Sequence, residues 1–143
     1  MAFRRLTIHD YLAYHELINE FRPTQFSEVQ FIQVLIEIEK SGAIWVYEEE
    51  DGLLATGTII YEHKFIMNGC IYAHIEDVCV RATHRRKGIG KRLINHLIGE
   101  AKYCYKITLD CADTNVPFYE ACGLERRGNQ MCQLMEIIRS REV

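Results

Sequence analysis

Positive charge is concentrated around two glycines in residues 81–93, RATHRRKGIGKRL. Six lysines and arginines fall in this segment, although the whole chain carries a formal net charge of −3. Gly88 and Gly90 lack the Cβ atoms that would hold a phosphate away from the backbone amides. A helical pattern of apolar residues follows, and the first amides of a helix have no acceptor within it. The segment therefore predicts an anion-binding loop that opens a helix.

Two common phosphate-binding motifs do not fit this loop. A Walker loop needs Ser or Thr after its lysine, whereas Arg92 follows Lys91. A dinucleotide-binding fingerprint needs a third glycine where Leu93 stands, and an early βαβ unit. The remaining pattern is (Gln/Arg)-x-x-Gly-x-(Gly/Ala), with a solvated basic helix start and a nucleic-acid-binding patch as alternatives. Nucleic acid is disfavoured, because the rest of the chain is acidic and no aromatic residue interleaves the patch.

The composition is that of an ordinary globular protein. With 143 residues, 48% hydrophobic and 26% charged, the chain predicts a single domain over 1–143. No apolar run approaches the ~20 residues of a membrane span and no secretory signal is recognised, so we expect a cytoplasmic protein. The six cysteines show no CxxC spacing, which favours reduced core thiols over disulfides. The six histidines form no metal-binding motif, so we expect no metal.

The elements around the loop follow from the apolar periodicity. Helices are expected where apolar residues recur every three to four positions: 10–22, 27–41, 89–101 and 116–122. Strands are expected where apolar residues alternate or run together: 43–47, 53–66, 71–80, 105–111 and 131–138. A capping box of Ser27 and Gln30 opens the second helix, Gly42 closes it, and Asn68-Gly69 predicts a hairpin. This order predicts an α/β (α+β) fold with a mixed sheet and helices on its faces.

Several further segments make the chain recognisable. Residues 85–90 resemble the pyrophosphate loop of the GCN5-related N-acetyltransferases, which bind acetyl-coenzyme A. Within that superfamily, the segments IIYEHKFI, HIEDVCV, CYKITLDC, NVPFYEACG and GNQM are similar to the glucosamine-6-phosphate N-acetyltransferase family, in register from about Ser27 to Met131. The resemblance implies the superfamily's mostly antiparallel central sheet with helices on both faces. It also implies acetyl transfer to the amine of glucosamine 6-phosphate, a step of UDP-N-acetylglucosamine biosynthesis.

The resemblance also implies a cofactor site. The anion of the basic loop is then the coenzyme A pyrophosphate, with neighbouring basic residues available to the 3′-phosphate. A bulge in the strand before the loop separates it from the next strand and frees backbone groups for the pantetheine arm, and the Val78 amide faces the thioester oxygen. Asn115 is expected to hold pantetheine and cap the short helix. The expected cofactor-binding residues are Val78, Cys79, Val80, Arg85, Arg86, Lys87, Gly88, Ile89, Gly90, Lys91, Asn115, Phe118 and Tyr119.

Acetyl transfer needs a neutral amine, a donor to the oxyanion and stabilisation of the leaving thiolate. The resemblance gives the last role to Tyr119. A tyrosine has a pKa of about 10 and a thiol about 8.5, so full proton transfer is uphill by about 2 kcal/mol and a strong hydrogen bond is expected instead. Glu76 and Asp110 are the other expected catalytic residues, which orient the amine and hydroxyls through water; no dedicated base is assigned. A regular pleat would put Glu76, Val78 and Val80 on one side of their strand, opposite Asp77 and Cys79.

For the acceptor, the resemblance implies residues of the hairpin, the bulged strand and the strand after the basic helix. The expected substrate-binding residues are Lys64, Phe65, Ile66, Met67, Glu76, Asp77, Val78, Tyr105, Lys106 and Asp110. Tyr105 and Lys106 are expected from a second subunit, because family members are intertwined homodimers with a shared cleft. Another amino sugar or a protein amine stays an alternative acceptor.

The chain departs from the family pattern in two places. The loop before the second helix reads EFRPT where the family has a Leu-Thr-x-x-Gly type of sequence. The terminal Met-x-x-Arg, whose arginine binds the substrate phosphate, here ends in Leu134. Arg22 or Arg139 is the candidate to replace that arginine. The chain also continues past the family's usual end to Val143.

Overall fold

A five-stranded sheet forms the centre of the computed structural model, which describes residues 2–135. The strands lie in the order β1-β2-β3-β4-β5, and only the β4–β5 pair is parallel. Their bounds are β1 Ala2–Arg5, β2 Gly42–Glu49, β3 Gly52–His63, β4 Ile71–Val80 and β5 Lys106–Thr108. The mixed, mostly antiparallel sheet is thus confirmed. The chain divides into two units, Met1–Leu109 and Asp110–Val143, and the single domain over 1–143 stays a prediction.

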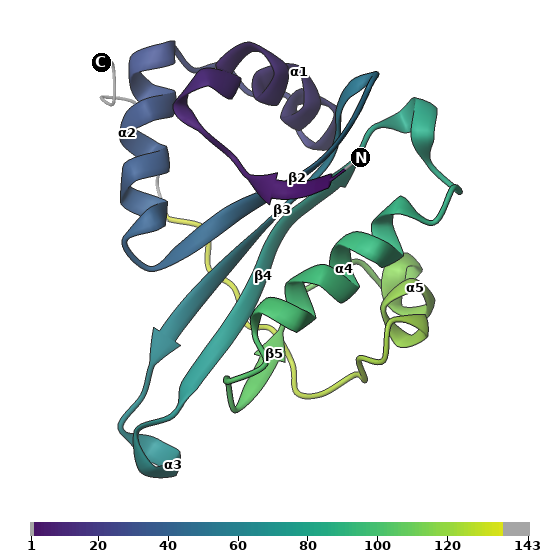
Figure 1. Cartoon of the computed structure of the whole chain (residues 1–143). Helices are drawn as coiled ribbons and strands as arrows, with labels where there is room; N and C mark the ends of the chain where they lie inside the picture. Colours follow the sequence, from purple (N-terminus) through teal and green to yellow (C-terminus); the bar gives the residue numbers. More distant parts are fainter. Residues whose placement is uncertain (1, 136–143) are drawn as a thin grey trace. The chain divides into compact units, whose positions relative to one another are not determined.

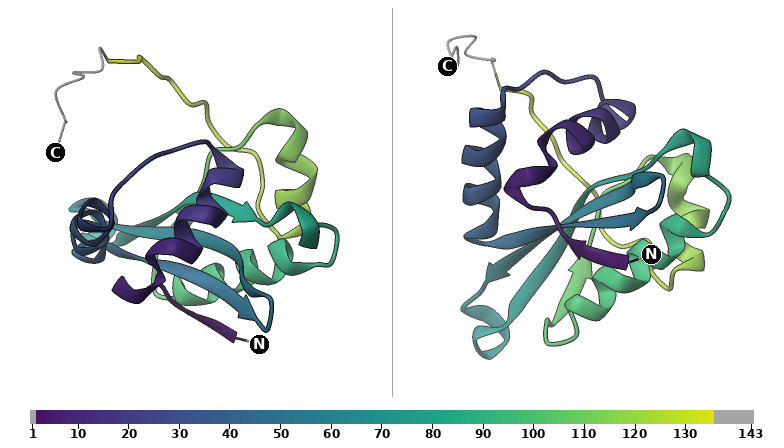
Figure 2. Two further views of the ribbon diagram at one scale, coloured as in Figure 1. Left: turned by 90° about the horizontal axis from the view of Figure 1, so that it is seen from above. Right: turned by 45° about the horizontal axis from the view of Figure 1, so that its top comes forward.

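Helices cover both faces of the sheet in the first unit (Figure 1). The helices α1 (Tyr11–Phe21) and α2 (Glu28–Glu39) lie on one face, and α4 (Ile89–Glu100) lies on the other (Figure 2). The short α3 (Ile66–Gly69) forms the tip of the long β3–β4 hairpin. The second unit contains α5 (Val116–Ala121). Among residues 2–135, no helix is long and apolar enough to cross a membrane.

Two apolar layers hold α1, α2 and α4 to the sheet. The layer beneath α1 and α2 consists of Leu6, Leu17, Phe31, Leu35, Ile44, Val46, Leu53 and Cys79. On the other face, α4 buries Ile89, Leu93, Ile94 and Leu97. A Cβ on Gly57 of β3 would lie 2.9 Å from Leu97 Cδ1, so this glycine allows the close approach of α4. The apolar stripe predicted for residues 89–101 therefore faces the sheet.

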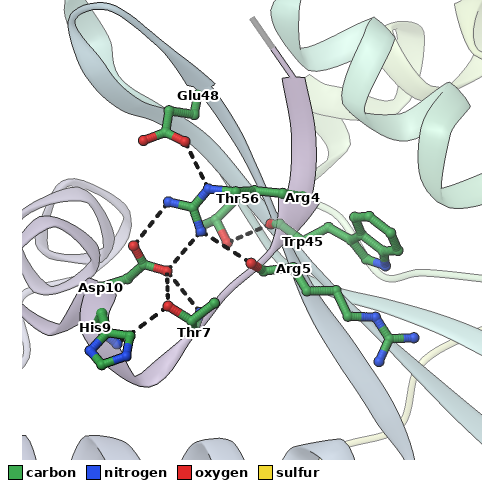
Figure 3. A network of polar contacts seen from close by, with 8 residues as sticks. All are labelled: Arg4, Arg5, Thr7, His9, Asp10, Trp45, Glu48 and Thr56. Carbon is green, nitrogen blue, oxygen red and sulfur yellow. Dashed lines mark hydrogen bonds and ion pairs between the residues drawn. The ribbon is translucent and has the colours of Figure 1, made fainter.

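The first strand, β1, was not predicted, because two of its four residues are arginines and hide any apolar alternation. Its Arg4 joins three elements (Figure 3). The guanidinium donates to both carboxylate oxygens of Asp10 at 2.9 Å and to Glu48 Oε2 at 2.7 Å. Asp10 also completes a capping box with Thr7. The network ties β1 to β2 and to the start of α1.

Several predicted boundaries shift, each for a local reason. The hairpin tip uses three residues with positive φ, Met67, Asn68 and Gly69, so β3 ends at His63 rather than at residue 66. The capping box of Ser27 and Gln30 is confirmed. Gly42, however, begins β2 rather than closing α2, and its missing Cβ makes room for the carbonyl of Ile59.

The carboxyl-terminal strands differ most from the prediction. The strand expected at 105–111 is limited to β5, whose pairing with β4 ends at the His74–Thr108 pair. Of the last predicted strand, residues 131–135 form none, and 136–138 lie outside the described residues. All six cysteines are free, as predicted. They are not all core thiols, since Cys111 and Cys132 are exposed.

Candidate active site

The strand β4 carries one extra residue opposite Gly57. Thr56 pairs with Cys79 and Thr58 pairs with Glu76, so Asp77 and Val78 together face one residue of β3. Asp77 has φ of 50°, in the left-handed region that aspartate tolerates better than most residues. This is the β-bulge that the resemblance implied.

The bulge inverts the alternation of side chains along β4. Residues paired across antiparallel strands share a face of the sheet. Glu76 therefore lies on the face of Thr58, whereas Val80 lies on the face of its partner Ala55. Because Thr58 and Ala55 are three apart on a regular stretch of β3, these faces are opposite. The prediction that Glu76 and Val80 share one side is wrong, since it assumed a regular pleat.

Contacts with the helices identify the two faces. Cys79 donates a weak hydrogen bond to the carbonyl of Leu17 in α1, with Sγ 3.6 Å from the oxygen. Val78 points to the side of α4, because its Cγ2 lies 3.6 Å from where a Cβ on Gly57 would be. Glu76 and Cys79 thus belong to the α1 face, and Val78 and Val80 to the α4 face.

One edge of β4 is open beside the bulge. The ladder to β5 ends at His74, and no described residue continues it along 75–80. On the other edge, Arg81 N donates to Leu54 O, so Val80 and Ala55 form a non-hydrogen-bonded pair and the backbone groups of Val80 point to the open edge. The Val80 carbonyl accepts from Arg85 Nε at 3.2 Å. The backbone groups at this edge can form hydrogen bonds with an extended ligand that contains amide groups.

The basic loop forms the predicted turn into α4. Gly88 is the N-cap, with φ of 78° and no side-chain capping bond. The first helical bond runs from Arg92 N to Gly88 O at 3.1 Å. The amides of residues 89–91 therefore have no acceptor within the helix, as an anion site requires.

Only part of the positive charge in the loop is available. Arg81 binds Glu16 at 3.1 Å and Glu20 at 3.2 Å. Arg92 lies over the Tyr47 ring, 4.9 Å from its centroid. In contrast, three exposed cations have no side-chain partner within residues 2–135: Arg86, Lys87 and Lys91. These three side chains are free to bind an anion.

A second cationic cluster lies beside the tip of the β3–β4 hairpin, where Lys64 directly follows β3 and Tyr72 is the second residue of β4. Lys64 Nζ and Lys106 Nζ lie 5.0 and 4.5 Å from the centroid of the Tyr72 ring. Tyr105 stacks on the same ring at 5.9 Å, and Lys64 also pairs with Glu62 at 3.4 Å. Lys64 thus shares the Tyr72 ring with Tyr105 and Lys106 of its own chain, whereas those two residues were expected to come from a second subunit. At the hairpin tip, the other predicted residues are exposed: Phe65, Ile66 and Met67.

In the second unit, Tyr119 is half-buried on α5. Burial raises the pKa of its hydroxyl, and the nearby Cys111 and Cys122 raise it further. The hydroxyl is therefore protonated at neutral pH and can donate a hydrogen bond. The ring of Phe118 lies edge-on to Tyr119, with centroids 4.9 Å apart.

The two other predicted residues of this unit are exposed. Asp110 Oδ2 accepts a hydrogen bond from Gln130 Nε2 at 2.9 Å. Asn115 occupies the N-cap of α5, but its side chain makes no capping bond, so the expected capping role is wrong. Its backbone amide instead donates to Ala112 O at 2.9 Å, which closes a short 3₁₀ turn.

Sequence reasoning missed Tyr14, which lies on α1. Burial raises the pKa of Tyr14, and the Asp77 carboxylate raises it further. Its hydroxyl therefore lies within electrostatic reach of the bulge. No motif in the sequence marks this residue, because its place depends on how α1 packs on β4.

Comparison with known proteins gives consistent matches over almost the whole chain. Residues 11–124 match the profile of the Acetyltransferase (GNAT) family. Glucosamine 6-phosphate N-acetyltransferase 1 of Dictyostelium discoideum is 37% identical over 139 residues, which cover 92% of this chain and 88% of that protein. The Arabidopsis thaliana glucosamine 6-phosphate N-acetyltransferase is 34% identical over 142 residues, 93% of this chain and 95% of that protein. The crystal structure of the Arabidopsis enzyme matches with a TM-score of 0.89 at 33% identity, over 94% of this chain and 98% of that chain.

Proposed function

The chain belongs to the acetyltransferase (GNAT) family, and on that premise we propose that it acetylates glucosamine 6-phosphate. Acetyl-coenzyme A, the co-substrate of the family, supplies the acetyl group, and the products are N-acetylglucosamine 6-phosphate and coenzyme A. The observation that carries the proposal is the 37% identity, over 92% of this chain, to an enzyme of that specificity. The reaction is a step of UDP-N-acetylglucosamine biosynthesis.

The basic loop is the proposed site of the coenzyme A pyrophosphate. Three features support this assignment: a glycine N-cap, free amides at residues 89–91, and three cations without a partner in the described chain. Apart from its two chain neighbours, no atom of residues 2–135 would lie within 4 Å of a Cβ on Gly88, so this space is left for a ligand by the described part of the chain. We propose that all the cofactor-binding residues expected from the sequence contact coenzyme A.

The open edge of β4 is the proposed site of the pantetheine arm. The amides of the pantetheine arm would pair with the backbone of Val78, Cys79 and Val80, as an added strand does. Because the Val80 carbonyl already accepts from Arg85, the Val80 amide is the group left for the arm. The Val78 amide is proposed to donate to the thioester oxygen as negative charge develops there.

Tyr119 is the proposed donor to the leaving thiolate. Its raised pKa disfavours full proton transfer and leaves hydrogen bonding as its contribution. Glu76 and Asp110 are proposed to orient the amine, and both carboxylates are exposed and so accessible to a substrate. We assign no dedicated base.

Lys64, Tyr105 and Lys106 are proposed to contact the acceptor and its phosphate, with Phe65, Ile66, Met67, Asp77 and Val78 completing the site. Two ammonium groups over one ring offer a phosphate dianion charge-assisted hydrogen bonds. Leu134, where the family has arginine, is 90% exposed and offers no charge. Arg22 is exposed at the end of α1, and Arg139 lies outside the described residues. Either arginine is a candidate replacement.

We further propose a cytoplasmic, intertwined homodimer. Six free cysteines agree with a reducing compartment. The three-residue β5 is an edge strand, and the segment after α5 exposes Met131, Leu134 and Met135. An edge strand and an exposed apolar segment are both covered when chains exchange their carboxyl-terminal segments.

Steady-state kinetics with three acceptors tests the proposed function. We expect kcat/KM to be highest for glucosamine 6-phosphate, lower for glucosamine 1-phosphate and lowest for glucosamine. Lys64→Ala should remove the preference for the 6-phosphate, whereas Lys40→Ala, an exposed lysine paired with Glu37 on α2, should keep it. Equal rates with glucosamine would contradict the phosphate site, and acetylation of peptides alone would identify a protein acceptor. Binding of duplex DNA without binding of coenzyme A would indicate a non-catalytic module.

A further inference from the structure

Two contacts fix how α1 runs alongside β4 and the start of the basic loop. Glu20 Oε1 accepts from the Ala82 amide at 2.8 Å, and one turn earlier the Leu17 carbonyl accepts from Cys79 Sγ at 3.6 Å. Because α1 and β4 run in the same direction at these contacts, moving three residues back along α1, about 4.5 Å, corresponds to moving back by only one to two residues of the strand. Residues three apart lie on one face of a helix, so the next contact belongs to Tyr14. The residues of β4 that it reaches are those of the bulge.

The ring of Tyr14 is held by packing. It lies against Phe31 of α2, with ring centroids 5.8 Å apart, and the side chain is half-buried. The rise in its pKa from burial and from the Asp77 carboxylate agrees with a hydroxyl directed at the bulge. Because that pKa is raised, the hydroxyl stays protonated at neutral pH and acts as a donor.

The hydroxyl of Tyr14 is not used by the described part of the fold. Tyr11, one turn earlier on the same helix, donates its hydroxyl to the carbonyl of Phe26 at 2.7 Å. Within residues 2–135, the Tyr14 hydroxyl has no such partner. Among the described residues, the Tyr14 hydroxyl oxygen is not one of the fully buried polar atoms without a partner, so water reaches it and a ligand hydroxyl can take the place of that water. An accessible donor on the helix that packs against the bulge, within electrostatic reach of Asp77, therefore points to a ligand.

Resting on the proposed function, we propose that Tyr14 is a specificity-determining residue that donates a hydrogen bond to a ring hydroxyl of the amino-sugar acceptor. The acceptor lies against the bulge at Glu76 and Asp77, on the face of β4 that α1 covers. The carboxylates there accept from the amine and hydroxyls of the sugar, whereas Tyr14 supplies a donor. The two kinds of group together select a polyhydroxylated amine over a simple alkyl amine.

Tyr14→Phe tests the inference, because it removes one oxygen and keeps the ring against Phe31. We expect the KM for glucosamine 6-phosphate to rise about three- to tenfold, with kcat and the KM for acetyl-coenzyme A unchanged. The matched control is Tyr11→Phe, which loses a hydrogen bond of the fold. It should lower the melting temperature and leave the acceptor KM unchanged.

Acceptor analogues that each lack one ring hydroxyl give the decisive comparison. The wild-type enzyme should discriminate against one analogue, and Tyr14→Phe should lose that discrimination. An unchanged acceptor KM in Tyr14→Phe, or a rise in the KM for acetyl-coenzyme A instead, overturns the inference. A different result would contradict the proposed function: the wild-type enzyme would not acetylate glucosamine 6-phosphate. The amine that it does acetylate then serves for the same comparison of variants.

Discussion

Gly88→Val should abolish tight binding of coenzyme A while the protein still folds. Gly88 has φ of 78°, and among the described residues no atom beyond its chain neighbours lies within 4 Å of a Cβ placed there. The substitution therefore creates no clash within the chain and costs only the strain of a branched residue at positive φ, about 1–2 kcal/mol. The new side chain instead occupies the space in front of the amides of residues 89–91, where the pyrophosphate is proposed to bind.

The loss of affinity can be estimated from the hydrogen bonds at risk. A bond from a backbone amide to a charged phosphate oxygen contributes about 1.5–3 kcal/mol. Losing one such bond weakens binding by about ten- to a hundredfold, and losing two weakens it further. Calorimetric titration with coenzyme A measures this change directly, and thermal unfolding measures the strain.

The hairpin tip offers a matched control. Gly69 has the same φ of 78°, and in the described part of the chain a Cβ there would meet the Lys64 carbonyl alone, at 3.9 Å. Gly69→Val should therefore lower the melting temperature about as much as Gly88→Val, with the affinity for coenzyme A unchanged. An unchanged dissociation constant in Gly88→Val would place the cofactor elsewhere. Equal losses of affinity in both variants would show that backbone strain, not the loop, is responsible.

Two further predictions concern turnover and acid stability. Tyr119→Phe should lower kcat about ten- to a hundredfold, because the hydroxyl acts as thiolate charge develops, and the dissociation constants of both substrates should change little. Unchanged turnover between pH 6 and 9, a range set by the assay, would show that the tyrosine has a structural role. The hydrogen bonds from Arg4 hold the pKa of Asp10 below its ordinary value of 3.8. Because the folded pKa is depressed, this stabilisation is present above the unfolded pKa and is lost as the pH falls through the folded pKa. Melting temperatures measured between pH 7 and pH 2.5 test this, and they should fall less steeply at the acid end in Asp10→Asn than in the wild type. The control is Asp113→Asn, which removes an exposed ion pair with Arg126 and should show the same pH dependence as the wild type.

Features encoded by neighbouring residues were predicted from the sequence. The capping box of Ser27 and Gln30, the bounds of β4 and the start of α4 at Ile89 all match the structure. Each depends on residues within one or two turns of a helix or along one strand, so the local pattern suffices. The loop that precedes α4 is predicted for the same reason.

Features that depend on distant residues required the tertiary structure. The strand β1 is defined by its pairing with β2, and the hairpin cations are brought together by Tyr72. The role of Gly42 is set by the carbonyl of Ile59, which no sequence window around the glycine contains.

The candidate site shows the same division most clearly. The sequence by itself determined the anion loop, the acetyltransferase resemblance and the order of the elements around them, because each is written in short contiguous segments. Only the tertiary structure decided which face of β4 each residue occupies. A bulge is created by the mismatch with β3 opposite Gly57, and it moves Glu76 to the face of α1. The packing of α1 on that face brings Leu17 against Cys79 and Tyr14 within electrostatic reach of Asp77, and neither the mismatch nor the packing has a local signature.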